Sequence, residues 1–176
     1  MYKNILINFI LATLPATRFF RLKRALLNTL GLKISKGAKI CGGTKIYGRG
    51  EIVIGEDSWI GIGTILIPAP NSAITIGARC DIAPGVILHT GSHEFGDSFR
   101  RAGVGYSLPI SIGDGTWIGT RVVVLGGVSI GKANMLAAST TILPGNYPDN
   151  CFIAGIPGTI KKQFHTQPNS SRQNSI

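Results

Sequence analysis

The segment that decides the fold is residues 112–142, which read IGDGTWIGTRVVVLGGVSIGKANMLAASTTI. An aliphatic residue returns at every sixth position of this segment: Ile112, Ile118, Val124, Ile130, Leu136 and Ile142. A period of six matches neither the 3.6-residue turn of an α-helix nor the two-residue alternation of an ordinary strand. It is typical of a parallel β-helix, in which each hexad supplies one short strand and one turn.

The same period extends towards the N-terminus, with two shifts of register. Its earlier members are Ile34, Ile40, Ile46 and Ile52, then Ile54, Ile60 and Leu66, then Ile76, Ile82 and Leu88. A glycine follows many of them, which allows the chain to turn tightly at a corner. Three hexads would close one triangular coil, and coils would stack about 4.8 Å apart. We therefore predict an all-β solenoid of hexapeptide repeats over residues 34–157.

The two ends of the chain differ from the repeat. One coil cannot bury its own core, so a solenoid needs caps, and we predict an α-helical cap over residues 1–33. Its apolar run is interrupted by Asn8 and Pro15 and is shorter than the roughly 20 residues that cross a bilayer. Residues 158–176 are predicted to form a C-terminal tail that is basic at first and then polar.

Charge is spread unevenly over a chain with a formal net charge of +10. Ten bases precede Glu51, the first acidic residue: Lys3, Arg18, Arg21, Lys23, Arg24, Lys33, Lys36, Lys39, Lys45 and Arg49. This asymmetry predicts anionic partners, and we expect peripheral contact with an anionic membrane surface through residues 18–24. Nucleic acid is not expected, because no aromatic residues are interleaved with the bases.

Three cysteines, Cys41, Cys80 and Cys151, are widely spaced and form no CxxC motif. An odd number of separated thiols fits a reducing compartment. We therefore expect the protein in the cytoplasm, at the inner face of the membrane where it makes peripheral contact.

The period stops between Leu88 and Ile112 and resumes in phase, because the gap is a multiple of six. We predict an extended loop over residues 89–111, inserted between coils that stack unchanged. The loop holds two of the three histidines, His89 and His93. Long loops inside compact repeats are usually functional, so the chemistry is expected here.

Four motifs stand in order along the chain: TGSHE at 90–94, YSLPISIGDGTWIG at 106–119, GGVSIGKANMLAAST at 126–140 and AGIPG at 154–158. With them the sequence resembles the hexapeptide-repeat acyltransferases, in the branch that contains galactoside, maltose and colanic-acid O-acetyltransferases. The resemblance covers residues 34–162. It implies a left-handed β-helix, a homotrimer with active sites between subunits, and transfer of an acetyl group from acetyl-CoA to a hydroxyl, usually of a sugar.

The resemblance implies that His93 is the catalytic base. A histidine can remove the proton of a sugar hydroxyl and pass it to the departing CoA sulfur. No serine or cysteine nucleophile is required, because the hydroxyl and the thioester can react directly when held together. Glu94 is the second catalytic candidate, as a carboxylate that orients the imidazole, although a backbone carbonyl could do the same and Glu94 would then be a solvated loop residue.

For acetyl-CoA the resemblance implies six contact residues: Trp117, Gly119, Thr120 and Ala138 near the pantetheine arm, and Lys161 and Lys162 near the phosphates. Two segments depart from the family pattern. LPGN at 143–146 and IPGT at 156–159 stand where the family often has TKD and NPAR. A lysine and an arginine are therefore missing from expected phosphate contacts.

The acceptor site is predicted from the loop, where four side chains could recognise a sugar or a nucleotide-linked phosphate: His89, Asp97, Arg100 and Tyr106. WIGIGTIL at 59–66 replaces an asparagine-bearing segment of the galactoside enzymes, which disfavours a simple galactoside or maltose. We predict an acetyl-CoA-dependent O-acetyltransferase that modifies a saccharide or nucleotide-sugar in surface-polysaccharide biosynthesis.

Three alternatives remain open at this point. The first is N-acetylation of an amino sugar or an antibiotic on the same fold. The second is a zinc enzyme of carbonic-anhydrase type, which the HxxxH spacing of His89 and His93 would suit, with His165 as the third ligand. His165 lies in the predicted tail, and so we predict no metal. The third is a solenoid without catalysis.

Overall fold

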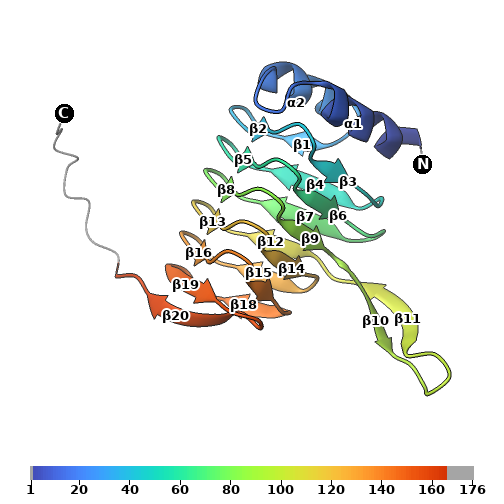
Figure 1. The fold of residues 1–176 in the computed structure, drawn as a ribbon, viewed down its shortest axis with the longest axis vertical. Coiled ribbons are helices and arrows are strands. Elements are labelled where there is room, and N and C mark those ends of the chain that lie inside the picture. The colour runs from blue at the N-terminus through green and yellow to red at the C-terminus, as the bar shows by residue number, and fades with distance from the viewer. Residues whose placement is uncertain (1, 166–176) are drawn as a thin grey trace.

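The computed structural model describes residues 2–165. Two helices, α1 (Tyr2–Thr13) and α2 (Phe20–Thr29), lie across one end of a parallel β-solenoid of about six turns (Figure 1). The predicted all-β fold is confirmed as a left-handed β-helix with an N-terminal helical cap.

Three sheets form the walls of the solenoid. The first contains β1 (Lys33–Ile34), β4 (Glu51–Ile54), β7 (Ala73–Ile76), β12 (Ile110–Ile112), β15 (Val128–Ile130) and β18 (Gly145–Tyr147). The second contains β2 (Lys39–Ile40), β5 (Trp59–Ile60), β8 (Asp81–Ile82), β13 (Trp117–Ile118), β16 (Met135–Leu136), β19 (Cys151–Ala154) and β20 (Thr159–Gln163). The third contains β3 (Lys45–Ile46), β6 (Ile65–Ile67), β9 (Ile87–His89), β14 (Val123–Leu125) and β17 (Thr141–Ile142).

The hexad residues stack in one inward column per sheet. In the parallel register, Ile54 lies beside Ile76 in the first sheet and Ile60 beside Ile82 in the second. These side chains are almost fully buried. Each strand is only two to four residues long in most coils, so the column of aliphatic side chains, rather than strand length, provides the apolar burial that stabilises the stack.

Every departure from the six-residue period falls at one edge of the solenoid. Four residues link the first sheet to the second in the first five coils, and four link the second to the third in each of those coils. The links from the third sheet to the next first-sheet strand vary in length: residues 47–50, 68–72, 90–109, 126–127 and 143–144. We call this edge the variable corner. It takes up all the irregular sequence, so the inward columns stay in register.

The cap closes the core at the N-terminal end. Ile7 and Leu11 of α1 and Leu27 of α2 are fully buried. The amide of Asn8 takes the place of a neighbouring strand, because its Oδ1 accepts from the Ile46 nitrogen at 2.8 Å and its Nδ2 donates to the Ile46 oxygen at 2.9 Å. The exposed backbone of the first coil is thus satisfied by a side chain of the cap.

Lys23 corrects part of the expectation drawn from charge. Its side chain is fully buried, and its Nζ donates to the carbonyl oxygens of Pro15 and Ala16, both at 2.9 Å, and of Ile40 at 3.2 Å. Burial lowers the pKa of this ammonium group. Lys23 joins the cap to the first coil and cannot meet an external anion.

The C-terminal end folds back on the last coil. Strand β20 pairs antiparallel with β19, so the segment expected as a tail begins with a strand. Residues 166–176, which hold most of the predicted polar tail, lie outside the described part of the chain. The division into segments 1–33, 34–157 and 158–176 stays a prediction.

Candidate active site

The irregular loop is a two-stranded ribbon that projects from the variable corner (Figure 1). Strands β10 (Gly91–Phe95) and β11 (Ala102–Ser107) pair antiparallel, with Ser92 opposite Tyr106 and His93 opposite Gly105. The sequence predicted an extended loop without indicating that its two arms pair with each other.

The foot of this hairpin is fixed to the preceding link at the same corner. The hydroxyl of Thr90, which is fully buried, accepts a hydrogen bond from the Ala69 nitrogen at 2.8 Å. Ser107 Oγ donates to the Pro70 oxygen at 3.0 Å, and the Leu108 nitrogen donates to the Thr90 oxygen at 3.0 Å. These bonds hold both arms of the hairpin where they leave the solenoid.

Asp97 builds the tip of the hairpin. Its Oδ1 accepts hydrogen bonds from the backbone nitrogens of Phe99 and Arg100, both at 2.9 Å, which is the usual way an aspartate stabilises a turn. The rings of Phe95 and Phe99 are fully exposed beside it, at 101% and 98%. Arg100 is exposed at the same tip.

His93 is held by a backbone carbonyl. Its Nδ1 lies 3.0 Å from the Gly103 oxygen, and a carbonyl oxygen can only accept a hydrogen bond. Nδ1 therefore carries the proton in the neutral ring, and Nε2 keeps its lone pair as a base. The ring packs against Gly105 opposite, where a Cβ would lie 3.6 Å from His93 Cε1, an ordinary van der Waals contact.

Sequence reasoning missed the part played by Gly103. Its carbonyl orients the imidazole, whereas Glu94 lies at an irregularity of the pairing between His93 and Phe95. Within residues 2–165 no hydrogen bond or ion pair involves the Glu94 side chain. Tyr106 pairs with Ser92 and lies on the face opposite His93. No sequence pattern reports a backbone acceptor ten residues away, so only the pairing of the two arms could have revealed it.

His89 stands at the foot of the hairpin, in the third sheet. It lies between Ile67 and Leu125 of the neighbouring coils and is half-buried. In the described residues, no three or more His, Cys, Asp or Glu side chains gather in a group that could hold a metal ion.

Four of the residues expected near the pantetheine arm come together at or beside the corner between the second and third sheets. Trp117 points outward and is 51% exposed, and Thr120 and Ala138 are exposed in successive coils. The Ser139 nitrogen donates to the Thr120 oxygen at 2.8 Å. A Cβ on Gly119 would lie 2.7 Å from the Ala138 nitrogen, so coil packing alone already requires glycine at this position.

Lys162 continues the outward side of the second sheet, and Lys161 follows at an irregularity of the pairing. Trp117 is in register with Met135, Met135 with Phe152, and Phe152 with Lys162. Both lysines are exposed on β20. The structure therefore aligns the aromatic and cationic candidates along one face of the solenoid.

One chain does not bring these candidates to His93. The hairpin leaves from the variable corner, between the third and first sheets, whereas Thr120 and Ala138 lie at the corner between the second and third sheets. The base and the expected CoA contacts therefore occupy different edges of the same solenoid.

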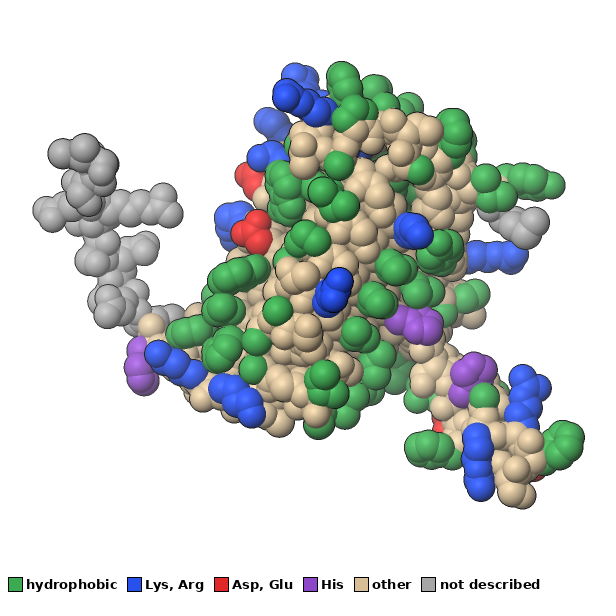
Figure 2. Space-filling model, in the orientation of Figure 1, with side chains coloured by type: hydrophobic (Ala, Val, Ile, Leu, Met, Phe, Trp, Pro, Cys, Tyr) green, Lys and Arg blue, Asp and Glu red, His purple; other side chains and the backbone are tan. Residues whose placement is uncertain are grey.

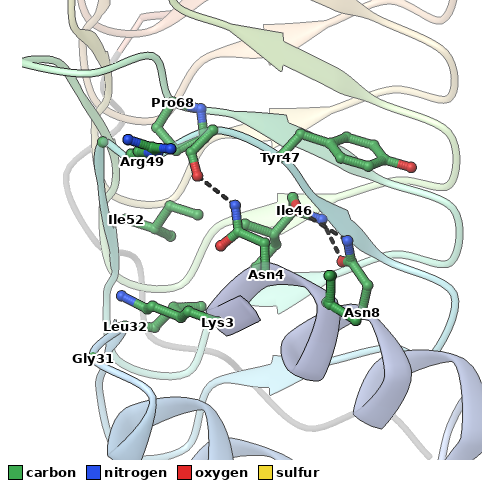
Figure 3. A pocket seen from close by; sticks show the side chains of 13 residues that line it. Lys3, Asn4, Asn8, Gly31, Leu32, Ile46, Tyr47, Arg49, Ile52 and Pro68 are labelled. Carbon is green, nitrogen blue, oxygen red and sulfur yellow. Dashed lines mark hydrogen bonds between the residues drawn. The ribbon is translucent and has the colours of Figure 1, made fainter. Parts of the chain in front are cut away.

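A cleft of about 570 Å³ lies elsewhere, between α1 and the first coils (Figure 3). Lys3, Asn4, Arg49 and Pro68 are among its lining residues. None of the predicted site residues lines this cleft. It is separate from the hairpin chemistry and needs its own explanation.

Comparison with known families finds a similarity over part of the chain. Residues 109–144 match the family model described as bacterial transferase hexapeptide (six repeats). This match covers part of the solenoid, and the chain is similar in sequence to galactoside and colanic-acid acetyltransferases.

Three relatives show the extent of this similarity. A putative acetyltransferase of Saccharomyces cerevisiae is 30% identical over 73% of this chain and 63% of its own length. Galactoside O-acetyltransferase of Escherichia coli is 36% identical over 52% of this chain and 45% of its own length. The putative colanic acid biosynthesis acetyltransferase of E. coli is 29% identical over 82% of this chain and 76% of its own length. The chain thus spans less than two thirds of the first two relatives.

The solved structures share the fold. A galactoside acetyltransferase in complex with coenzyme A superposes with a TM-score of 0.77, covering 99% of this chain and 89% of the other at 23% identity. The β-solenoid with its helical cap is therefore common to both molecules.

Proposed function

We propose that the protein is an acetyl-CoA-dependent O-acetyltransferase that acts on a hydroxyl of a saccharide. The observation that carries the proposal is the bond from His93 Nδ1 to the Gly103 oxygen, which leaves Nε2 free as a base on an exposed hairpin. Relatives that include a galactoside O-acetyltransferase support the choice of a sugar hydroxyl over other acceptors.

The reaction needs only one proton carrier. Nε2 of His93 takes the proton of the acceptor hydroxyl while the hydroxyl oxygen attacks the thioester carbonyl carbon. The carbon–sulfur bond then breaks, and the imidazolium returns the proton to the CoA sulfur. The products are an acetyl ester and free CoA, and His93 regains its starting state.

Acetyl-CoA is placed along the corner between the second and third sheets. Thr120 and Ala138 would contact the pantetheine arm, while Gly119 keeps the two coils close enough for this. Lys161 and Lys162 stand at the end of the same face, where cationic side chains suit the phosphates of the cofactor.

A homotrimer would complete the site. Because His93 and the CoA candidates occupy different edges of one chain, a hairpin from one subunit must reach the CoA corner of its neighbour. The exposed rings of Phe95 and Phe99 would then be covered by that neighbour. Sedimentation analysis should give a trimer, and a Phe95→Ser/Phe99→Ser variant should shift towards monomer; an unshifted variant would contradict this arrangement.

The acceptor is proposed to be a saccharide or nucleotide-sugar used in surface-polysaccharide biosynthesis, in keeping with the colanic-acid relative. His89 at the foot of the hairpin and Arg100 at its tip are proposed to contact it, with Asp97 shaping the tip and Tyr106 on the opposite face of the ribbon. Three buried free cysteines favour the reducing cytoplasm, and we place the enzyme at the inner face of the membrane.

Thiol release from acetyl-CoA, measured across a panel of sugars, amino sugars and nucleotide-sugars, tests the activity. We expect turnover with at least one hydroxyl acceptor, and mass spectrometry should find the acetyl group on oxygen. Acetylation only of amino sugars would replace the proposal by N-acetylation. No turnover with any member of a panel that includes polysaccharide precursors would overturn it.

A further inference from the structure

Helix α1 is apolar on the face that meets the solenoid and also on the face that does not. Ile7 and Leu11 are buried against the first coil, while Tyr2, Ile5, Leu6 and Phe9 on the outer face are exposed by 83%, 60%, 47% and 63%. A helix that is hydrophobic all round is normally covered on every side. Within residues 2–165 nothing covers the outer face of α1.

The surroundings of this outer face are basic. The acidic residues begin at Glu51, whereas Lys3, Arg18, Arg21 and Lys36 are exposed on or beside the cap. Figure 2 shows hydrophobic side chains at the helical end of the molecule with Lys and Arg side chains beside them. The missing partner should therefore be apolar at its centre and anionic around it.

The cleft between α1 and the first coils combines the same two properties (Figure 3). Lys3 and Arg49 supply cations from α1 and from the variable corner, with Ile52 between them, Leu32 beside Lys3 and Pro68 beside Arg49. None of the residues that line the cleft is acidic. It could hold a phosphate at the two bases and an alkyl segment against the apolar residues.

A second cleft of about 580 Å³ lies beside α2. Its lining combines apolar residues with three bases and no acid: Phe19, Phe20, Arg21, Leu22, Arg24, Gly37, Ala38 and Lys39. The cap thus has two cationic, partly apolar clefts, one beside each helix.

We propose that the helical cap docks on a bilayer that contains anionic phospholipids. Helix α1 lies in the interface with Ile5 and Phe9 among the acyl chains, as amphipathic interfacial helices do. Headgroup phosphates bind at Lys3 with Arg49 and at Arg21 with Arg24. At 12 residues, α1 cannot cross the bilayer, and no described helix is long and apolar enough to do so.

A second copy of the chain is a poorer partner for the same surface. Two caps placed face to face would bring their basic side chains together without an acidic residue before Glu51 to compensate, and like charges oppose such an approach. Each of these bases instead strengthens binding to an anionic lipid surface by about fivefold.

The proposed trimer would strengthen docking without being required for it. Three copies around an axis parallel to the solenoid place their three caps at the same end. Three weak contacts with one membrane then act together, and the second and third become intramolecular. Only this strengthening by three linked contacts depends on the proposed trimer.

Flotation with vesicles of phosphatidylcholine alone, or mixed with phosphatidylglycerol, tests the proposal on the full-length protein. We expect binding to the mixed vesicles only, weakened by added salt. Ile5→Ser/Phe9→Ser and Arg21→Gln/Arg24→Gln should each weaken it at least tenfold. Leu143→Ser and Lys132→Gln, similar changes in the C-terminal coils, should bind as the wild type does.

Other measurements keep the test decisive if a double variant folds poorly. In Phe9→Trp the new indole should shift its emission to shorter wavelength on mixed vesicles. Wild-type binding to phosphatidylcholine alone, or unchanged binding by both cap variants, would overturn the proposal. A doubled molecular mass in the absence of lipid would also overturn the proposal if Ile5→Ser/Phe9→Ser abolishes the doubling. A second copy of the chain would then cover the outer face of α1. Thiol release without vesicles should be unchanged in the cap variants, so the activity and the docking can fail independently.

Discussion

The Nδ1 atom of His93 and the carbonyl oxygen of Gly103 lie 3.0 Å apart across the two arms of the hairpin. The imidazole is therefore oriented by the backbone of the ribbon that displays it, without a carboxylate. The hairpin presents His93 as one unit, so the proposed base chemistry depends on the pairing of β10 with β11.

Replacing the base should abolish most of the activity. We expect His93→Ala to lower kcat by about 10²–10⁴-fold, the usual range for general-base catalysis, with an unchanged circular dichroism spectrum. Glu94→Gln is the matched control and should stay within a few-fold of the wild type, because Gly103 already orients the ring. An equal loss in Glu94→Gln would assign the orienting part to the carboxylate, and an active His93→Ala would remove the mechanism.

Alanine substitution at two glycines can distinguish an effect on coil packing from an effect on cofactor binding. A Cβ at Gly113 would lie 2.5 Å from the Gly131 carbonyl carbon, and one at Gly119 would lie 2.7 Å from the Ala138 nitrogen. Both alanine variants should lower the melting temperature, since backbone in the next coil must move. Only Gly119→Ala should also raise the KM for acetyl-CoA, because it displaces Ala138. A similar KM increase in Gly113→Ala would argue against placing the cofactor at this corner.

Lys23 should contribute far more to stability than the other lysines of its region. Lys23→Met leaves the Ile40 oxygen without a donor, while the oxygens of Pro15 and Ala16 keep the backbone nitrogens of Arg18 and Gly42; a buried group that loses its only partner costs about 1–3 kcal/mol. Lys33→Met is the control, because the Lys33–Glu51 ion pair is exposed and such pairs are worth about 0–1 kcal/mol. Denaturant unfolding should give Lys23→Met a free energy of unfolding about 1–3 kcal/mol below that of the wild type; equal midpoints for the two variants would contradict the bonding described for Lys23.

Stability should fall in alkaline solution, in part through Cys80. Burial raises the pKa of this thiol above its ordinary value of 9.0, and its Sγ donates to the Gly113 oxygen at 3.3 Å. Above pH 9.0 the unfolded chain loses a proton that the folded chain keeps. The free energy of unfolding therefore falls by up to about 1.4 kcal/mol per pH unit. The stabilisation is complete below pH 9.0 and is lost as pH rises through the folded pKa. Unfolding of Cys80→Val should depend less steeply on pH there; an identical slope would count against this effect.

The solenoid could be predicted because its physics repeats. The inward columns need an aliphatic side chain every six residues, and the sequence from Ile112 to Ile142 meets this requirement at six successive positions. The phase kept between Leu88 and Ile112 likewise revealed an insertion that leaves the stack intact. The helical cap followed from the need to close the core.

The remainder depends on contacts between distant segments. Nothing near Lys23 in the sequence marks it as the one buried base of a basic run, because its three acceptors meet only after the cap has folded. The Gly103 acceptor likewise exists only once the hairpin arms pair. The expected residues at Thr120 and Ala138 came from a family resemblance, and their place at a corner away from His93 required the three-dimensional path of the chain.

The variable corner separates what folding constrains from what can change. Residues added there shift no inward side chain, since the other links keep their four residues and the coils above and below stay in register. The hairpin could therefore be lengthened, shortened or exchanged as a unit while the core and the opposite corners remain as they are. New acceptor preferences can arise at this edge without a cost in foldability, and the two-residue links at 126–127 and 143–144 are natural places to graft a second loop.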